Sequence, residues 1–443
     1  MYRATVSPAQ HKDRVGSTRG TQPVRRAAAV VAVAVVATLT ASACSSTKGS
    51  SGPSAKPTAT AKAGADIKLG VITSLTGSLS SGFTTVENGV KARLAVENAK
   101  GGVNGRKIKY VMADDTSTAA GTVAAVKKLI QQDKVYGILD NSAFFSAGAK
   151  VAKAAAVPVS GVSFDGGPAW HDPSYTNMFD AFGLGDLNKV STTYGTFFKS
   201  EGATKMAVVA YANTASTLAA KGAMESTVRA GLAKAYTNYQ LPPGTTDVGP
   251  VVAQIKASGA DALYMPVVPN TAFAIVVGLK RAGVKLKSVV TTTGYGGDLL
   301  KSPDALAAGE GINFITTGAP VEAQTPATKA FQDALATYAN STDIPSFAEY
   351  IGWMTTDLFI AGLKLAGTNA SAADFISKLR AGTWDGGGLQ KPENFANPIP
   401  AASGLGSQNC TNILKLTSGK FVPVANAVPI CGTIIDGAKV TYP

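Results

Sequence analysis

The sequence alternates between short runs of β-branched residues and longer stretches with helical periodicity. Residues 67–74 (IKLGVITS) and 107–113 have the composition of strands, and residues 84–100 between them predict an amphipathic helix. Strand followed by helix, repeated, is typical of parallel sheets whose faces are covered by helices. The chain is therefore predicted to be an α/β protein.

The alternation occurs twice along the chain. The first set continues with a helix at 118–133 and strands at 135–139 and 157–162. The second set follows a loop near residue 184, and its strands are predicted at 205–211, 235–239, 261–266 and 288–293. The pattern predicts two Rossmann-like lobes, each built on a parallel sheet.

Two later helices, at 325–340 and 348–366, follow the last of these strands and are expected to return to the first lobe. Several crossings between lobes would form a hinge, which suits closure on a ligand. The predicted division gives the first lobe residues 66–183 with a return segment at about 318–385, and the second lobe residues 184–317 with a C-terminal segment at about 386–443.

The first 43 residues have the layout of an export signal. Basic residues precede an apolar stretch at 27–39, which is too short to span a bilayer, and small residues occupy 41–43. Cys44 follows directly and resembles the acylated cysteine of bacterial lipoproteins. We expect residues 1–43 to be a lipoprotein signal peptide and Cys44 to be lipidated. Simple secretion and an uncleaved anchor are the alternatives, and the sequence leaves the export route, Sec or twin-arginine, open.

Residues 44–65 contain no large apolar side chain and predict a flexible tether. The formal charge of +13 is concentrated in this region and in the leader, which together hold 9 basic residues and 1 acidic residue. The 32 basic and 27 acidic residues that remain are dispersed along the chain. Nucleic acid is therefore not an expected partner.

Histidine and cysteine are scarce. His171 is the only histidine after the leader, which excludes a multi-histidine metal site, and no Gly-x-Ser-x-Gly elbow accompanies it. No cofactor is expected. Cys410 and Cys431 are the only cysteines beyond Cys44, and outside the cytoplasm they are expected to form a disulfide that pins a small C-terminal hairpin. If this tail lies outside the ligand cleft, reduction is expected to leave ligand binding intact.

Four segments occur together in a recognisable order. They resemble the branched-chain amino-acid (Leu/Ile/Val) binding proteins of bacterial ABC importers, which have the type I periplasmic-binding fold. The resemblance implies an extracytoplasmic solute-binding lipoprotein, not an enzyme, with a small-molecule ligand, ABC permease subunits and the membrane as partners. The segments are IKLGVITSLTGSLS (67–80), ENAKGGVNGRKIKYVMADD (97–115), AAVKKLIQQDKVYGIL (124–139) and PPGTTDVGPVVAQIKASGADALYMP (242–266).

The resemblance implies ligand contacts in loops beyond the strand ends of the first lobe, at 73–83, 140–146 and 160–166. Ser142 matches the family serine that holds a ligand carboxylate, and it is equally an N-cap candidate for the helix that follows. The predicted contacts of this lobe are Phe83, Asn141, Ser142, Ser163, Phe164 and Asp165.

The second lobe departs from the family pattern. Relatives carry a glutamate that pairs with the ligand ammonium, whereas this chain reads TTTGYGGD, with Gly294 or Tyr295 at that place. Asp165 of the other lobe is a possible substitute, although Asp in SFDGG is typical of a turn. The ligand is thus expected to lack an ammonium group, and leucine to bind poorly. Asn213, Thr293 and Tyr295 are the predicted contacts from this lobe.

Two other functions stay open from sequence alone. The same fold serves as a ligand-sensing module of membrane receptors. An exported enzyme would require His171 to lie beside a nucleophile in a pocket.

Overall fold

The computed structural model describes residues 64–170, 172–183, 186–316, 318–399, 401–402 and 404–442. The predicted signal peptide, Cys44 and nearly all of the predicted tether lie outside the described residues, as does His171. Within the described ranges, no helix has the length and apolarity needed to cross a bilayer.

The first sheet consists of parallel strands in the order β2-β1-β3-β4-β5. Thr73, at the end of β1, lies opposite Asp114 of β2 and Asn141 of β3. The carboxyl ends of these three strands are therefore level, and the loops that follow them share one edge of the sheet. The strands are β1 (Ile67–Thr73), β2 (Ile108–Asp114), β3 (Gly137–Asn141), β4 (Val159–Gly161) and β5 (Met178–Asp180).

The second sheet is mixed, in the order β15-β14-β11-β10-β9-β7-β8. Strands β7 to β11 pair in parallel, whereas β14 joins β11 antiparallel and continues into the antiparallel strand β15. The strands are β7 (Lys205–Tyr211), β8 (Ala233–Leu241), β9 (Ala262–Met265), β10 (Ser288–Thr291), β11 (Asn313–Thr316), β14 (Cys410–Thr417) and β15 (Lys420–Pro423).

Short strand pairs complete the described chain. β12 pairs with β13, β17 pairs with β6, and β16 pairs with the start of β14. Their bounds are β6 (Lys189–Ser191), β12 (Thr383–Trp384), β13 (Glu393–Asn394), β16 (Ile430–Cys431) and β17 (Ile434–Lys439).

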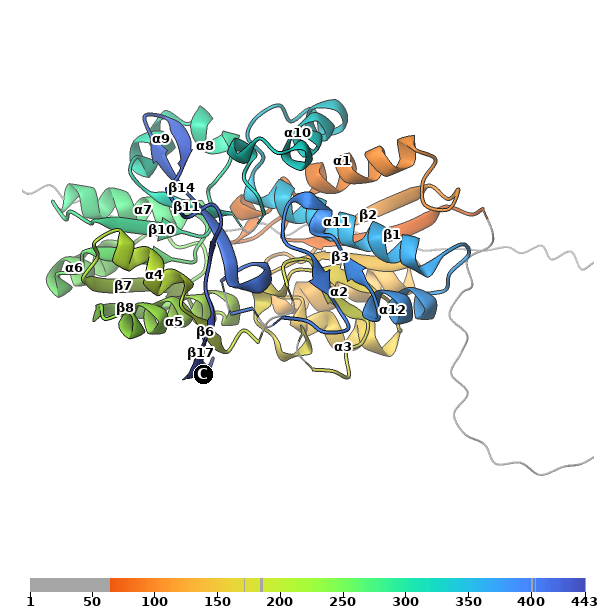
Figure 1. Cartoon of the computed structure of the whole chain (residues 1–443), viewed down its shortest axis with the longest axis horizontal. Helices are drawn as coiled ribbons and strands as arrows, with labels where there is room; N and C mark the ends of the chain where they lie inside the picture. Colours follow the sequence, from red (N-terminus) through yellow and green to blue (C-terminus); the bar gives the residue numbers. More distant parts are fainter. Residues whose placement is uncertain are drawn as a thin grey trace, which may run out of the picture. The chain divides into compact units, whose positions relative to one another are not determined.

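Helices cover both sheets (Figure 1). Apolar residues of α2 and α3 bury one face of the first sheet, and α1 and α11 pack on the other. The helices are α1 (Val86–Ala99), α2 (Ala119–Gln131), α3 (Ser146–Ala154), α4 (Thr193–Ser200), α5 (Thr214–Arg229), α6 (Gly249–Ser258), α7 (Pro269–Arg281), α8 (Gly297–Lys301), α9 (Pro303–Gly309), α10 (Pro326–Ala339), α11 (Phe347–Ala366) and α12 (Ala372–Arg380).

Two glycines bring α1 and α11 into backbone contact. A Cβ on Gly89 would collide with the carbonyl oxygen of Glu349 and lie 2.6 Å from the backbone nitrogen of Trp353. A Cβ on Gly352 would collide with the carbonyl oxygen of Val86. Only residues without a side chain allow this crossing, which fastens α11 to the first sheet although it follows strands β7 to β11 of the second sheet in the sequence (Figure 1).

A buried ion cluster continues this contact. Arg93 of α1 donates to Asp357 of α11 at 2.6 Å and to Glu97 at 3.1 Å, and Lys364 lies 2.8 Å from Glu97. Burial alone would raise the pKa of Glu97, but the hydrogen bonds and charges of Lys364 and Arg93 lower it. Trp384 of β12 donates to Asp357 at 2.8 Å and attaches the segment after α12.

The predicted α/β fold is confirmed: the first sheet is parallel, and the second has a parallel part, β7 to β11, which antiparallel strands extend. The strand predicted at 205–211 coincides with β7, and the two late helices are α10 and α11, which pack against α1. The strand predicted at 157–162 is shorter, because β4 pairs only at Val159–Gly161. Strand β5 was not predicted from the sequence, and the predicted C-terminal hairpin, β14–β15, extends the second sheet.

We expect Gly352→Ala to lower the free energy of unfolding by about 1–3 kcal/mol, because the added methyl group forces α1 and α11 apart. Urea denaturation followed by circular dichroism measures this change. Gly249→Ala is the matched control, since a Cβ at Gly249 meets open space. Equal stability of the two variants would contradict the proposed close contact.

Candidate ligand-binding site

A cavity of about 150 Å³ opens where loops after strands of both sheets meet. An apolar cavity of this volume holds a molecule the size of benzene. Its lining comes from both sheets, from the connecting segments and from the C-terminal part of the chain. The residues that line it are Leu79, Phe83, Ala143, Ser163, Phe164, Asp180, Phe182, Gly183, Leu187, Tyr211, Asn213, Ala215, Ser216, Ala219, Pro266, Val267, Val268, Thr292, Thr293, Ile315, Phe347, Ala401, Gly404 and Leu405.

Four phenylalanines form an aromatic wall of this cavity. The ring of Phe164 stacks on Phe347 and Phe182, with ring centroids 5.5 Å and 6.1 Å apart. Phe83 meets Phe347 edge-on at 6.2 Å. The four rings come from the loops after β1, β4 and β5 and from the first residue of α11. Such a wall offers a flat apolar ligand both dispersion and ring stacking.

Polar groups of the second sheet line the opposite side. Asn213 caps α5, because its side-chain oxygen accepts the N–H of Ser216 at 2.9 Å. The hydroxyl of Thr293 donates to the carbonyl of Val267 at 2.7 Å. The Ser216 hydroxyl is likewise committed to Tyr211 and Pro266. These side chains are held rigidly by the backbone, as a binding site requires.

Asp180 is the only carboxylate among the described residues of the cavity lining, which include no lysine or arginine. Its side chain is 1% exposed, and its oxygens accept N–H groups from Phe182 at 2.8 Å and Ser163 at 3.3 Å. Burial, with a smaller contribution from the charge of Asp165, raises the pKa of Asp180 to about 7 in spite of these hydrogen bonds. The protonated form is therefore well populated near neutral pH.

The predicted contacts Ser142 and Asn141 lie outside the cavity lining. The Ser142 hydroxyl donates to the Asp115 carboxylate and accepts the N–H of Phe144 at 3.0 Å. Asn141 is buried, with its side-chain oxygen 3.3 Å from the hydroxyl of Thr355. The loop reaches the cavity instead through Ala143. Ser142 is not the N-cap of α3, and its hydroxyl hydrogen-bonds within the loop.

Asp165 and Tyr295 also lie outside the cavity lining. Asp165 accepts N–H groups from Ser146, Gly167 and the Trp170 ring. It therefore stabilises a turn, which is the second of the two roles that the sequence allowed for it. Tyr295 is 1% exposed and donates to Glu322 at 2.7 Å. Burial raises the pKa of Tyr295, as do the neighbouring Tyr350 and Glu322. Of the predicted contacts, the cavity brings together Phe83, Ser163, Phe164, Asn213 and Thr293.

Several lining residues were not predicted from the sequence. Asp180 is the last residue of β5, and Phe182 and Leu187 follow this strand, which had no strand-like signal of its own. Phe347 begins α11, and the helix pattern alone does not show which end approaches the loops. Ala401, Gly404 and Leu405 belong to a segment without periodicity.

The sequence model of the periplasmic binding protein family matches residues 66–399. The chain belongs to the periplasmic binding protein family. This is a family of extracytoplasmic binding proteins rather than a class of enzymes. The cavity between the two sheets is thus the candidate solute site of a periplasmic binding protein.

Curated relatives are similar over most or part of the chain. The Leu/Ile/Val-binding protein BraC3 of Rhizobium johnstonii is 26% identical over 336 residues, which is 72% of this chain and 84% of that protein. An amino acid binding protein of Pseudomonas aeruginosa is 29% identical over 215 residues, which is 45% of this chain and 53% of that protein.

Solved structures show the fold to be that of type I periplasmic binding proteins. A solute binding protein of an ABC transporter from R. palustris, in complex with benzoate, has a TM-score of 0.66 at 17% identity, covering 84% of this chain and 98% of that one. A fatty acid ABC transporter substrate-binding protein from Thermomonospora curvata has a TM-score of 0.67 at 20% identity, covering 84% and 93%.

The raised pKa of Asp180 predicts that stability falls as pH rises. The folded protein binds a proton at Asp180 up to about pH 7, whereas the unfolded chain releases it near the ordinary aspartate pKa of 3.8, so stability is lost progressively between these values. We expect Asp180→Asn to remove part of this loss and to raise the melting temperature relative to wild type at pH 8 more than at pH 5.

Thermal unfolding at both pH values measures the effect. Glu393 has a pKa raised to about 7 by burial, with the charge of Asp180 contributing, so some pH dependence is expected to persist in the variant. Parallel curves for wild type and variant across this range would contradict the assignment.

Proposed function

We propose that this periplasmic binding protein captures a small, mainly apolar or aromatic molecule outside the cytoplasm and presents it to the permease of an ABC importer. Family membership supports the role in solute binding. The R. palustris and T. curvata proteins with the same fold are named as parts of ABC transporters, which supports the permease as partner.

The aromatic wall is the observation that carries the ligand class. Phe83, Phe164, Phe182 and Phe347 enclose a benzene-sized space with few polar groups. A cyclic or aromatic body fits this wall, and the polar side near Asn213 and Thr293 suits a hydrogen-bonding group on the ligand. A molecule of the benzoate class meets both requirements.

The charges of the lining argue against an amino acid. The family glutamate has no counterpart among the described lining residues, and Asp180 is held by backbone N–H groups with a pKa of about 7. The oxygens of Asp180 already accept the N–H groups of Phe182 and Ser163, and the described lining residues offer no second carboxylate to pair with a ligand ammonium. We therefore expect leucine to bind poorly.

We expect Phe164→Ala to weaken benzoate binding by about 10- to 100-fold, because it removes the ring that stacks on both Phe182 and Phe347. Isothermal titration calorimetry with benzoate, cyclohexanecarboxylate and leucine measures affinity and ligand class together. Phe273→Ala is the matched control, since Phe273 is a half-buried aromatic residue outside the lining. Submicromolar leucine binding by the wild-type protein would overturn the ligand class.

We also propose that Cys44 is acylated after export and anchors the protein in the membrane. The basic, apolar and small-residue order before Cys44 supports this, together with the polar segment after it. Mass spectrometry of the membrane fraction is expected to find a mature chain that begins with diacylated Cys44, and Cys44→Ser to release the protein. A mature N-terminus elsewhere in the chain would contradict the anchor.

A further inference from the structure

The C-terminal part of the chain reaches the ligand cavity from outside the family match. The match ends at residue 399, yet Ala401, Gly404 and Leu405 line the cavity. We refer to Ala401, Ala402, Gly404 and Leu405 as the wall segment. Its side chains are small or aliphatic, so it bounds the cavity without adding a charge.

The wall segment is held by a hydrogen bond from α4 and by close packing against β9 and α5. The Tyr194 hydroxyl donates to the carbonyl of Gly404 at 2.6 Å. Gly404 has a φ of +77°, and a Cβ there would lie 2.9 Å from the Tyr264 hydroxyl and 3.1 Å from the Ala219 Cβ. The segment is thus seated against β9 and α5 as closely as a glycine allows.

The turn after the wall segment is held from several sides. The N–H of Ala402 donates to the Asn409 side chain at 2.7 Å, and the N–H of Gly406 donates to the carbonyl of Cys410 at 2.9 Å. The carbonyl of Asn409 accepts the Thr193 hydroxyl at 2.8 Å and the N–H of Gly432 at 3.2 Å.

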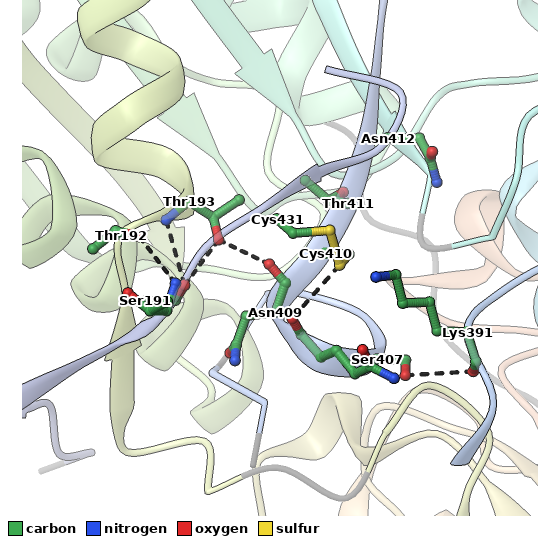
Figure 2. Close-up of a disulfide and its surroundings, with 12 residues drawn as sticks. Ser191, Thr192, Thr193, Lys391, Ser407, Asn409, Cys410, Thr411, Asn412 and Cys431 are labelled. Carbon is green, nitrogen blue, oxygen red and sulfur yellow. Dashed lines mark hydrogen bonds between the residues drawn. A yellow bond between two sulfur atoms is a disulfide. The ribbon is translucent and has the colours of Figure 1, made fainter. Parts of the chain in front are cut away.

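A disulfide closes this arrangement. Cys410, the first residue of β14, lies opposite Cys431 of β16, and their sulfur atoms are bonded (Figure 2). Figure 2 shows the disulfide close to Asn409. The hydrogen bond from the Thr193 hydroxyl to the carbonyl of Asn409 links this turn to α4. The cross-link therefore fixes the strand onto which the wall segment leads.

We propose that the wall segment determines ligand size at this site, and that the Cys410–Cys431 disulfide keeps it in place. The proposal rests on the proposed function. Leu405 is half-buried and lines the same cavity as Phe182 and Leu187, so its side chain limits the length of a ligand. The expectation that reduction spares binding does not hold for a tail in this position, because the tail forms part of the cavity.

The first test compares two neutral probes, benzene and ethylbenzene, by calorimetry. Their binding depends on cavity shape and not on the identity of the natural ligand. Leu405→Ala is expected to raise the affinity for ethylbenzene relative to benzene by about tenfold, since it removes three carbon atoms from the wall. Val422→Ala is the matched control in the same tail, 47% exposed on β15. A ratio unchanged in Leu405→Ala overturns the proposal.

Benzoate and 4-ethylbenzoate are titrated in parallel. If the wild-type protein binds benzene but neither acid, the proposed ligand class is wrong. The role of the wall segment in ligand size is then decided by benzene and ethylbenzene alone. The two failures are thereby distinguished.

The second test concerns the disulfide. Reduction of the native protein is expected to weaken benzene binding by about tenfold while the circular dichroism spectrum is retained. The reason is that the wall segment is then no longer held in one position against the cavity. Cys410→Ser combined with Cys431→Ser is expected to match the reduced protein. Equal benzene affinity in the oxidised and reduced folded protein would refute the role of the cross-link.

Discussion

The backbone contact between α1 and α11 is the constraint on which the arrangement of the chain depends. Gly89 and Gly352 let the two helices approach until main-chain atoms touch. The apolar faces of both helices then share one core with the first sheet, although α11 follows strands β7 to β11 of the second sheet in the sequence. Because α11 begins at Phe347, its attachment also sets the position of a ring in the aromatic wall. The packing of one helix pair thereby determines part of the cavity.

Carboxylates at the edge of the first sheet serve mainly to shape its loops. Asp115, Asp140, Asp165 and Asp180 are all buried there. Their oxygens accept backbone N–H groups and hydroxyls, as in the bond from Ser74 to Asp115 at 2.7 Å. Burial raises the pKa of Asp140 well above its usual range, and the charge of Asp165 adds to this. The polar residues of the loops thus hydrogen-bond to one another, and the cavity receives mostly apolar side chains.

The sequence predicted the sheets well because strand and helix periodicity is local. The site was predicted only in part. Ser142 stands at the family position, but its hydroxyl is taken by Asp115, 27 residues earlier, and no local pattern reports such a pairing. Tyr295 follows β10 as expected, yet it turns toward Glu322 and packs against Phe421 of β15 at 4.8 Å. The position of β15 depends on the long-range pairing of β14 with β11. The orientation of the Tyr295 side chain therefore could not be predicted from the residues next to it in the sequence.

The antiparallel pairing of β14 with β11 has a consequence for how the chain is made. β11 ends at Thr316, and its outer edge stays unpaired until Cys410–Thr417 has been synthesised. One face of the first sheet likewise stays partly uncovered until α11 has been synthesised. A chain emerging from the ribosome N-terminus first cannot complete either core until most of it exists, and long-range pairing is slow in any case. This order delays the completion of both sheets until most of the chain has been synthesised.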